Sequence, residues 1–144
     1  MLIVIFGESC TGKSTLAAQL KNTLQAEYYS GKDYLRLAKN EAIAKKLFQK
    51  KLETAVSGEN IIYVTAEKEQ LDLVPEGAVR VLVTAELNVI QKRFARRMGG
   101  TLPQPVAAML ERKHGCFDAL PHHYHMISGE TDPTRLCAAI CNAT

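Results

Sequence analysis

Hydrophobic positions in this 144-residue chain follow two alternating patterns. Short apolar runs, typical of strands buried on both faces, are separated by longer segments with apolar residues at helical spacing. The runs predict five strands, at residues 2–6, 27–30, 61–65, 79–84 and 124–128. Strands that alternate with helices are typical of a parallel sheet, so we expect an α/β fold with helices on both faces of the sheet.

The segments between these strands predict the helices. We expect helices at residues 15–24, 67–73, 86–98 and 106–119, the last interrupted near Gly115, and a final helix from Pro133 to Cys141 with Asp132 as its N-cap. Residues 32–56 form a longer helical region with a break at Asn40-Glu41. Its expected core contacts are Tyr34, Leu35, Leu37, Ile43, Leu47, Leu52 and Val56.

The most informative stretch lies between the first strand and the first helix. It fits the phosphate-binding P-loop pattern G-x-x-x-x-G-K-[ST], also called Walker A. It reads Gly7-Glu8-Ser9-Cys10-Thr11-Gly12-Lys13-Ser14, followed by Thr15. A strand before the pattern and a helix after it form the context that this motif requires, so the sequence predicts a site for phosphate groups.

The residue types of this loop suit that chemistry. Glycine at positions 7 and 12 lets the backbone approach an anion closely, in conformations closed to other residues. The loop amides and the helix N-terminus then face the phosphates. Lys13 is the cation expected on the β- and γ-phosphates, and Ser14 supplies the hydroxyl for Mg²⁺.

Composition limits the remaining possibilities. The chain is long enough for one domain, and its 47% apolar and 23% charged residues are ordinary for a globular protein. The apolar start is short and lacks a basic leader, and no apolar run approaches a membrane span, so we expect a cytoplasmic protein without a membrane segment. The cysteines form no C-x-x-C pair, and we expect neither a disulfide nor a zinc site at His122, His123 and His125.

Positive charge is concentrated in one segment. No Asp or Glu occurs between Glu86 and Glu111, whereas Lys92, Arg93, Arg96 and Arg97 all lie there, before the Gly/Pro-rich loop at residues 99–105. Phosphoryl transfer needs such charge around the transferred group. We therefore expect residues 92–105 to form a short cationic lid, to which Arg112 could return, although a basic solvent-exposed face is the alternative.

A second candidate segment follows the second strand. It reads Ser30-Gly31-Lys32-Asp33-Tyr34-Leu35-Arg36 and opens the region 30–57, which we expect to bind the phosphoryl acceptor. Arg36 could hold an anionic acceptor. Asp33 could take a proton from the acceptor hydroxyl or hold Mg²⁺ through water, or it could only cap the following helix. Glu67, beyond the third strand, could hold Mg²⁺-bound water or could be an ordinary helix-start carboxylate.

These motifs resemble the small P-loop kinases of the nucleoside monophosphate kinase and shikimate kinase group. Residues 7–14 match their phosphate loop, residues 30–36 are similar to the adenylate kinase segment with Asp followed by a phosphate-binding Arg, and Lys92 or Arg93 with Arg96 and Arg97 resembles the lid arginines. The resemblance implies the three-layer P-loop NTPase fold, with strand order 2-3-1-4-5, ATP with Mg²⁺, lid closure, and a last-strand loop at residues 124–132 that packs against adenine.

The sequence also departs from this family. The chain is shorter than typical members, which implies that the lid and the acceptor-binding region are both reduced. The third strand ends at Thr65, where an Asp is often present in P-loop proteins. No glycine-rich turn of the kind that shikimate kinases use to hold their substrate follows this strand, so shikimate is not the expected substrate.

The sequence thus predicts an ATP-dependent kinase that acts on a small molecule, with a nucleoside monophosphate as one acceptor class. The predicted catalytic residues are Lys13, Asp33, Arg96 and Arg97, nucleotide contacts come from residues 7–15 and Arg93, and acceptor contacts come from Ser30, Asp33, Arg36, Glu67 and Arg112. The alternative is a nucleotide-binding switch with little or no kinase activity, which the missing Asp favours. We expect a monomer or homodimer, and the net charge of +3 is too small to argue for nucleic acid as a partner.

Overall fold

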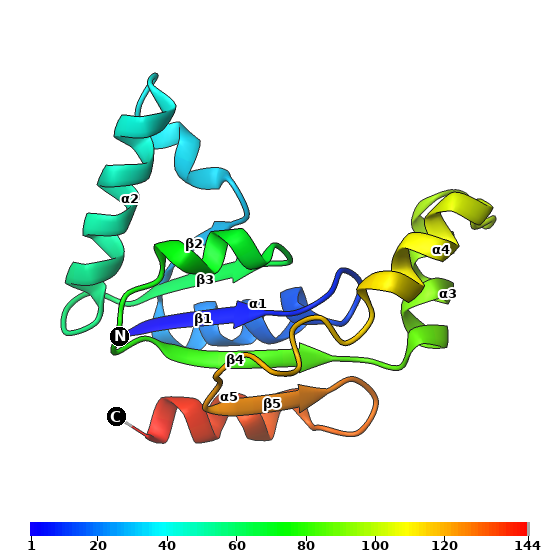
Figure 1. The fold of residues 1–144 in the computed structure, drawn as a ribbon. Coiled ribbons are helices and arrows are strands. Elements are labelled where there is room, and N and C mark those ends of the chain that lie inside the picture. The colour runs from blue at the N-terminus through cyan, green and yellow to red at the C-terminus, as the bar shows by residue number, and fades with distance from the viewer. Residues whose placement is uncertain (144) are drawn as a thin grey trace.

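The computed structural model describes residues 1–143 and contains one parallel sheet flanked by helices (Figure 1). The strands are β1 (Leu2–Phe6), β2 (Glu27–Ser30), β3 (Ile61–Thr65), β4 (Val79–Thr84) and β5 (Tyr124–Ile127). The α-helices are α1 (Lys13–Leu24), α2 (Glu41–Ala55), α3 (Leu87–Arg97), α4 (Gln104–Lys113) and α5 (Pro133–Asn142). Two 3₁₀ helices, η1 (Asp33–Leu37) and η2 (Lys68–Leu73), follow β2 and β3.

The five strands are parallel and lie in the order β2-β3-β1-β4-β5, which confirms the predicted order 2-3-1-4-5. Strand β1 occupies the centre, where every one of its residues is buried, and this explains its uninterrupted apolar sequence. In Figure 1 the arrows of β1, β3, β4 and β5 point toward the end of the sheet where α3 and α4 stand, and β2 runs parallel to β3. The chain segments that follow the strands therefore gather at that end, where ligands bind in open α/β sheets.

Two separate apolar cores cover the two faces of the sheet. Alternating residues of β1 divide between them, because successive side chains of a strand point to opposite faces. Ile3 and Ile5 pack with α1 and α5, whereas Leu2, Val4 and Phe6 pack with α2. The three-layer architecture predicted from the alternation of strands and helices is thus confirmed.

Helix α2 buries a different face from the one expected. Its buried residues are Ala44, Phe48, Leu52 and Ala55, whereas Ile43 and Leu47 are 54% and 43% exposed. Leu35 is also exposed, at 38%. The expectation that these three residues belong to the core was wrong. The buried set repeats every three or four residues and meets the sheet, so Ile43 and Leu47, one position earlier in each turn, are rotated toward solvent.

Phe48 is the centre of this core. Its ring lies 4.9 Å from the ring centroids of Tyr29 and Tyr63 and 5.2 Å from that of Tyr34, and it is fully buried. These contacts join α2 to β2, β3 and η1. The segment between β2 and β3 is therefore held against the sheet mainly by aromatic packing.

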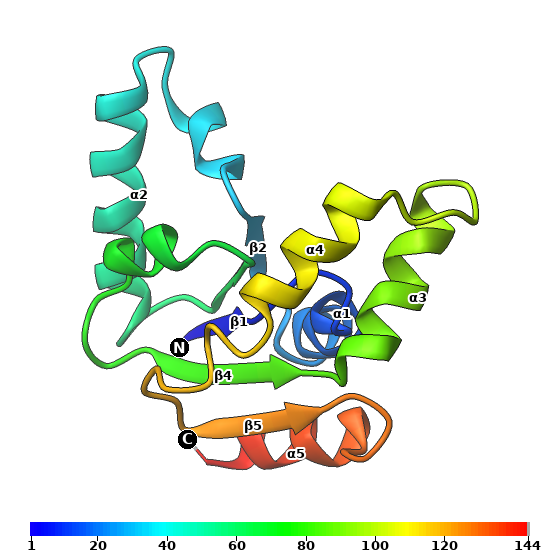
Figure 2. The ribbon, with the colours of Figure 1, turned by 45° about the vertical axis from the view of Figure 1, so that its right-hand side comes forward.

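Helices α3 and α4 form a hairpin at the carboxyl end of the sheet (Figure 2). Ile90 and Leu110 are buried between them, next to Ala85. Helix α4 ends at Lys113 rather than at residue 119, because Gly115 takes a left-handed conformation with φ 81° and the chain continues as turns. Phe117, in these turns, packs 5.9 Å from the ring of Phe6. Within residues 1–143, none of the helices is both long and apolar enough to cross a membrane.

Truncation of Phe48 should destabilise the protein far more than truncation of its exposed neighbour. We expect Phe48→Ala to lower the free energy of unfolding by about 3–5 kcal/mol, because it opens a cavity among three aromatic rings. Leu47→Ala, the matched control on the solvent side of the same helix, should cost about 1 kcal/mol or less. Urea denaturation followed by circular dichroism measures both values. Equal losses in the two variants would contradict this assignment of the buried face.

Candidate phosphate-binding site

The loop between β1 and α1 has the backbone that the P-loop motif requires. A Cβ atom at Gly7 would lie 2.1 Å from the carbonyl oxygen of Val83 in the neighbouring strand, so only glycine fits there. Gly12 takes φ 100° directly before α1, a conformation that side chains rarely adopt. The helix begins at Lys13, two residues earlier than predicted, and its N-terminal amides therefore face the space enclosed by the loop.

The side chain of Lys13 folds back over this loop. Its Nζ donates a hydrogen bond of 2.6 Å to the carbonyl oxygen of Glu8, and the hydroxyl of Thr11 donates to the same oxygen at 2.8 Å. Burial lowers the pKa of Lys13 from 10.5 to about 8; Cys10 and Glu8 oppose this shift, and the neighbouring positive charge of Arg97 adds to it. At pH 7 the amine is still mainly protonated, as an anion-binding role needs.

The carboxylate of Glu8 bonds to partners other than Lys13. It is almost fully buried and accepts hydrogen bonds from the backbone N–H of Gly115, at 3.1 Å, and from Nδ1 of His114, at 3.2 Å. Both partners follow α4 directly. Glu8 therefore joins the P-loop to the chain that leaves the α3–α4 hairpin. Its two partners lie more than 100 positions away in the sequence, and the sequence analysis did not predict this contact.

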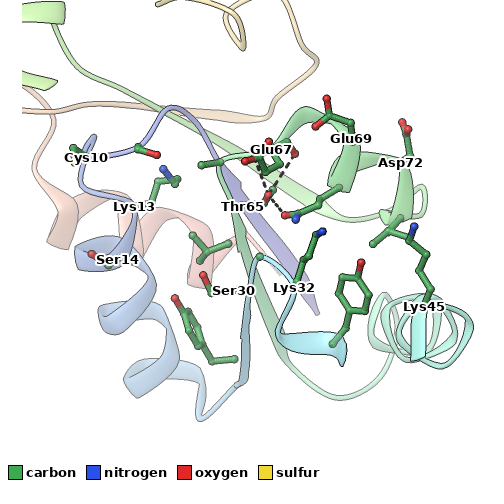
Figure 3. Close-up of a pocket in the computed structure, with 18 of the residues that line it drawn as sticks. Cys10, Lys13, Ser14, Ser30, Lys32, Lys45, Thr65, Glu67, Glu69 and Asp72 are labelled. Atoms are coloured by element: carbon green, nitrogen blue, oxygen red, sulfur yellow. Dashed lines mark hydrogen bonds between the residues drawn. The ribbon is translucent and has the colours of Figure 1, made fainter. Parts of the chain in front are cut away.

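Two cavities open on either side of the P-loop. The larger, here called the acceptor cavity, has a volume of about 1120 Å³ and lies between the P-loop, the segment that follows β2, helix α2 and η2. Figure 3 shows Lys13 and Ser14 at one side of it, with Lys32, Lys45, Glu69 and Asp72 at the other. Ser30 and Glu67 line it as well, so both of these predicted acceptor contacts are brought to the P-loop.

The smaller cavity, here called the nucleotide cavity, has a volume of about 740 Å³. It lies between the P-loop, α3 and the loop from Ser128 to Asp132, which the sequence predicted at this edge. Arg93 closes one side of it: its guanidinium donates to the carbonyl oxygen of Cys10 at 3.0 Å and to the Ser128 hydroxyl at 2.9 Å. Arg93 thus links α3 to the P-loop and to the loop after β5, and Thr15 lines the same cavity.

Four residues line both cavities. They are Cys10, Gly12, Ser14 and Arg97. A phosphate group held by the P-loop would therefore lie where the two cavities meet, with the Arg97 guanidinium beside it. Of the other P-loop residues, Ser9 lines the acceptor cavity, whereas Gly7, Glu8 and Thr11 are buried and shape the loop.

Asp33 and Arg36 do not line either cavity in this structure. The Asp33 carboxylate accepts a hydrogen bond of 2.9 Å from the backbone N–H of Ser30 and closes the turn after β2. It does not cap η1, whose N-cap position has no side-chain hydrogen bond. Arg36 lies 4.4 Å from the ring centroid of Tyr29 and donates to the carbonyl oxygen of Tyr28 at 3.3 Å, which holds it outside the acceptor cavity.

Only some of the predicted lid residues lie at the cavities. Arg93 and Arg97 line the cavities, whereas Arg96 and Arg112, which are exposed as Arg97 is, line neither. Sequence spacing placed Arg93, Arg96 and Arg97 on one stretch of helix but could not tell which of them faces the P-loop. Helix α2 contributes a group that was missed: Glu41, Lys45 and Gln49 line the acceptor cavity. Their i, i+4, i+8 spacing could have predicted that they lie together, because residues at this spacing share one face of a helix.

The end of β3 carries a hydrogen-bonded network instead of the Asp often found there. The Thr65 hydroxyl donates to Oε1 of Gln70, and the backbone N–H of Glu67 donates to the Thr65 hydroxyl at 3.0 Å. The Tyr63 hydroxyl donates to the carbonyl oxygen of Gly31 at 2.8 Å and lies 3.3 Å from Oε1 of Gln70. Burial raises the pKa of the Tyr63 hydroxyl well above its ordinary range, so it stays protonated and acts as a donor.

The residues at the P-loop fit a nucleotide with Mg²⁺. The Ser14 hydroxyl is exposed on the first turn of α1 and faces both cavities, next to the loop amides and Lys13. In the described part of the chain, no three His, Cys, Asp or Glu side chains gather closely enough to hold a metal ion by themselves. This donor set suits Mg²⁺, which is typically held by one or two protein oxygens together with phosphates.

Comparison with solved structures identifies the fold. The chain is similar over 99% of its length to shikimate kinase from Acinetobacter baumannii (TM-score 0.66, 13% identity, 91% of that chain). It is equally similar to the YorR protein of Bacillus subtilis, solved with phosphorylated GDP (TM-score 0.66, 21% identity, 99% and 95% of the two chains). A gluconokinase from Sinorhizobium meliloti also matches (TM-score 0.58, 12% identity, 99% and 96%). The chain therefore has the fold of the small P-loop kinases. No protein-family model matches this sequence, and no curated protein sequence does.

The buried ammonium of Lys13 should make stability depend on pH. Its pKa is about 8 in the folded protein, below the ordinary 10.5, so the cost of burying the charge is present below pH 8 and is lost as the pH rises toward 10.5. We expect Lys13→Met to raise the free energy of unfolding at pH 7, by on the order of 3 kcal/mol, with the gain shrinking at pH 10. Urea denaturation at both pH values measures it. Lys46→Met, at an exposed position on α2, is the control, and a pH-independent gain would contradict the prediction.

Proposed function

We propose that this protein is an ATP-dependent kinase that transfers a phosphoryl group to a hydroxyl of a small-molecule acceptor. The observation that carries this proposal is the meeting of two cavities at the P-loop, with Gly12, Ser14 and Arg97 on the walls of both. Transfer requires a donor and an acceptor on opposite sides of the transferred group. A protein that only bound a nucleotide would need the nucleotide cavity alone.

The P-loop residues would hold and orient the nucleotide phosphates. The loop amides and the N-terminus of α1 donate to phosphate oxygens, and Lys13 exchanges its carbonyl partner on Glu8 for the β- and γ-phosphates. The base and ribose then occupy the nucleotide cavity, between Arg93 and the Ser128–Asp132 loop. Mg²⁺, bound through the Ser14 hydroxyl, would neutralise charge on the phosphate oxygens.

The acceptor would bind on the other side of the P-loop. Its hydroxyl oxygen forms a bond to the γ-phosphorus while the bond from that phosphorus to the bridging β–γ oxygen breaks, and the electron pair of the broken bond stays on the departing ADP. Glu67, which lines the acceptor cavity, takes the hydroxyl proton and passes it to water. Arg97 stabilises the charge that spreads over the equatorial oxygens during transfer. Asp33 has no such access, because its carboxylate closes the turn after β2.

The structural similarities support this proposal at the level of the reaction class. Shikimate kinase and gluconokinase share this fold over nearly the whole of both chains, and both are kinases of small molecules. At 12–13% identity they carry no information about the acceptor of this protein. A nucleotide-binding switch is the second candidate, favoured by Thr65 at the end of β3. Nucleotide binding without transfer to any acceptor would support it.

Lys13 should be essential for transfer and dispensable for folding. We expect Lys13→Ala to lower the turnover of ATP in the presence of acceptor by about 100-fold or more, because the variant lacks the ammonium group that would stabilise the negative charge of the transferred phosphoryl group. Circular dichroism should show an unchanged fold. The control is Lys46→Ala, which removes an exposed lysine that lines neither cavity. Turnover that survives in Lys13→Ala would count decisively against the proposed function.

The adjacent arginines at the end of α3 should differ in their effects. Arg97 lines both cavities and Arg96 lines neither. We therefore expect Arg97→Ala to lower kcat by about 100-fold, as for the loss of a group that stabilises the transition state. Arg96→Ala should change kcat by about threefold or less, because a surface charge acts weakly through water. Steady-state kinetics with ATP as the varied substrate measures both, and a larger loss in Arg96→Ala would refute this assignment.

A further inference from the structure

In the part of the acceptor cavity that lies away from the P-loop, negatively charged side chains outnumber positively charged ones. Besides Lys13 and Arg97, its lining contains four carboxylates and two ammonium groups: Glu41, Glu67, Glu69, Asp72, Lys32 and Lys45. None of these six takes part in an ion pair among residues 1–143. Figure 3 shows Glu67, Glu69 and Asp72 along η2, across from Lys32 and Lys45. An anionic group placed beside η2 would therefore meet net negative charge.

No arginine clamp for an anion is available on this side. Among the described residues, Arg97 is the only arginine that lines the acceptor cavity, and it lies at the P-loop end. Arg36 is held against the ring of Tyr29 and the carbonyl oxygen of Tyr28. A bidentate arginine is the group that best matches a carboxylate or a phosphate, so the cavity lacks the usual device for gripping an anionic acceptor.

A buried amide points instead to a ligand rich in hydroxyl groups. Gln70 lines the acceptor cavity and is only 8% exposed. Its Oε1 accepts a hydrogen bond from the Thr65 hydroxyl and lies 3.3 Å from that of Tyr63. This contact fixes the orientation of the amide, and its Nε2 donates to no other residue among residues 1–143. No buried side-chain nitrogen or oxygen among these residues is unpaired, so Nε2 reaches the solvent of the cavity, where a ligand oxygen can accept from it.

From these observations, which rest on the proposed kinase function, we propose that the acceptor is a hydroxyl-rich molecule without an anionic group, of the sugar or polyol class. Its hydroxyls can accept from Gln70 and the two lysines and donate to the carboxylates of η2. One hydroxyl forms the new bond to the γ-phosphorus, and its proton leaves through Glu67. The carboxylates beside η2 disfavour nucleoside monophosphates and sugar acids as acceptors.

A matched series of acceptors tests the charge preference. D-Glucose, D-gluconate and D-glucosamine, together with other neutral sugars and polyols and their acid or amino counterparts, and AMP, should be assayed for ³¹P-detected transfer from ATP. Binding of each compound should also be measured calorimetrically with Mg²⁺ and a non-hydrolysable ATP analogue, so that the result does not depend on turnover. We expect the neutral or amino members to bind at least about tenfold more tightly than their acid counterparts.

The outcomes separate this inference from the proposed function. Binding or transfer that favours the neutral or amino members supports the inference. A preference for the acid members or for AMP overturns it while leaving the kinase function intact. Binding of nucleotide with no transfer to any compound overturns the kinase function, and the charge preference is still read from binding. If no neutral or amino member binds, the inference is overturned as well.

Substitutions in the cavity test the residues that set this preference. Gln70→Glu keeps an oxygen for Thr65 and Tyr63 but removes the N–H donor, so the KM for a neutral acceptor should rise by about tenfold with an unchanged KM for ATP. Gln19→Glu, on α1 and outside both cavities, is the matched control. A merely structural role for Gln70 would instead lower the melting temperature and weaken both substrates equally, which would overturn its assignment.

Charge reversal on η2 should broaden the specificity toward anions. The double substitution Glu69→Lys and Asp72→Lys replaces two exposed carboxylates of the cavity wall and should shift the ratio of acid to neutral acceptor binding by about tenfold toward the acid. Glu76→Lys reverses an exposed carboxylate that lines neither cavity, and it should leave the ratio unchanged. An unchanged ratio in the double variant would overturn the role of η2.

Discussion

The buried ammonium of Lys13 is the group on which the arrangement of this site depends. Glu8 is the acidic residue closest in sequence, yet it bonds to Lys13 only through its backbone carbonyl oxygen, while its carboxylate accepts from Gly115 and His114. The carboxylate favours the protonated amine through its charge but forms no ion pair with it, and burial still lowers the pKa of Lys13. An anion at the P-loop is the partner that would compensate its burial, which is why the lowered pKa of Lys13 and phosphate binding have the same physical origin.

The scaffold explains how this charge can be kept in position. The backbone at Gly7 lies so close to the Val83 carbonyl that no side chain fits between them, and Gly12 takes a left-handed conformation directly before α1. Arg93 ties the hairpin of α3 and α4 to the carbonyl oxygen of Cys10, and Glu8 ties the exit of that hairpin to the other side of the loop. The α3–α4 hairpin is therefore attached to the P-loop at two points, one on α3 and one directly after α4.

The sequence predicted the features that depend on local patterns and missed those that depend on distant contacts. The apolar runs were enough to predict the five strands, and the resemblance gave their order. The P-loop spacing predicted the glycine loop before α1, and Gly7 and Gly12 take conformations that suit that motif. Spacing alone could not show that Arg97 faces the cavities while Arg96 does not, or that Arg36 is drawn onto Tyr29. Ile43 and Leu47 are apolar yet exposed, because the sheet selects which face of α2 is buried, and that choice is made by Phe48 and its three aromatic neighbours.

The hydrogen bonds of Thr65 explain why a hydroxyl suits the end of β3. A carboxylate at this position would hold water or Mg²⁺ beside the P-loop, and it would repel Glu67 two residues later. The hydroxyl instead accepts from the backbone of Glu67 and donates to Gln70, so it fixes a carboxylate and an amide that both belong to the acceptor cavity. In the proposed kinase, the end of β3 would therefore serve recognition of the acceptor, and Mg²⁺ would be held by Ser14 and the phosphates. On this reasoning, the departure from the common P-loop pattern reflects a change in what β3 positions rather than the loss of phosphoryl transfer.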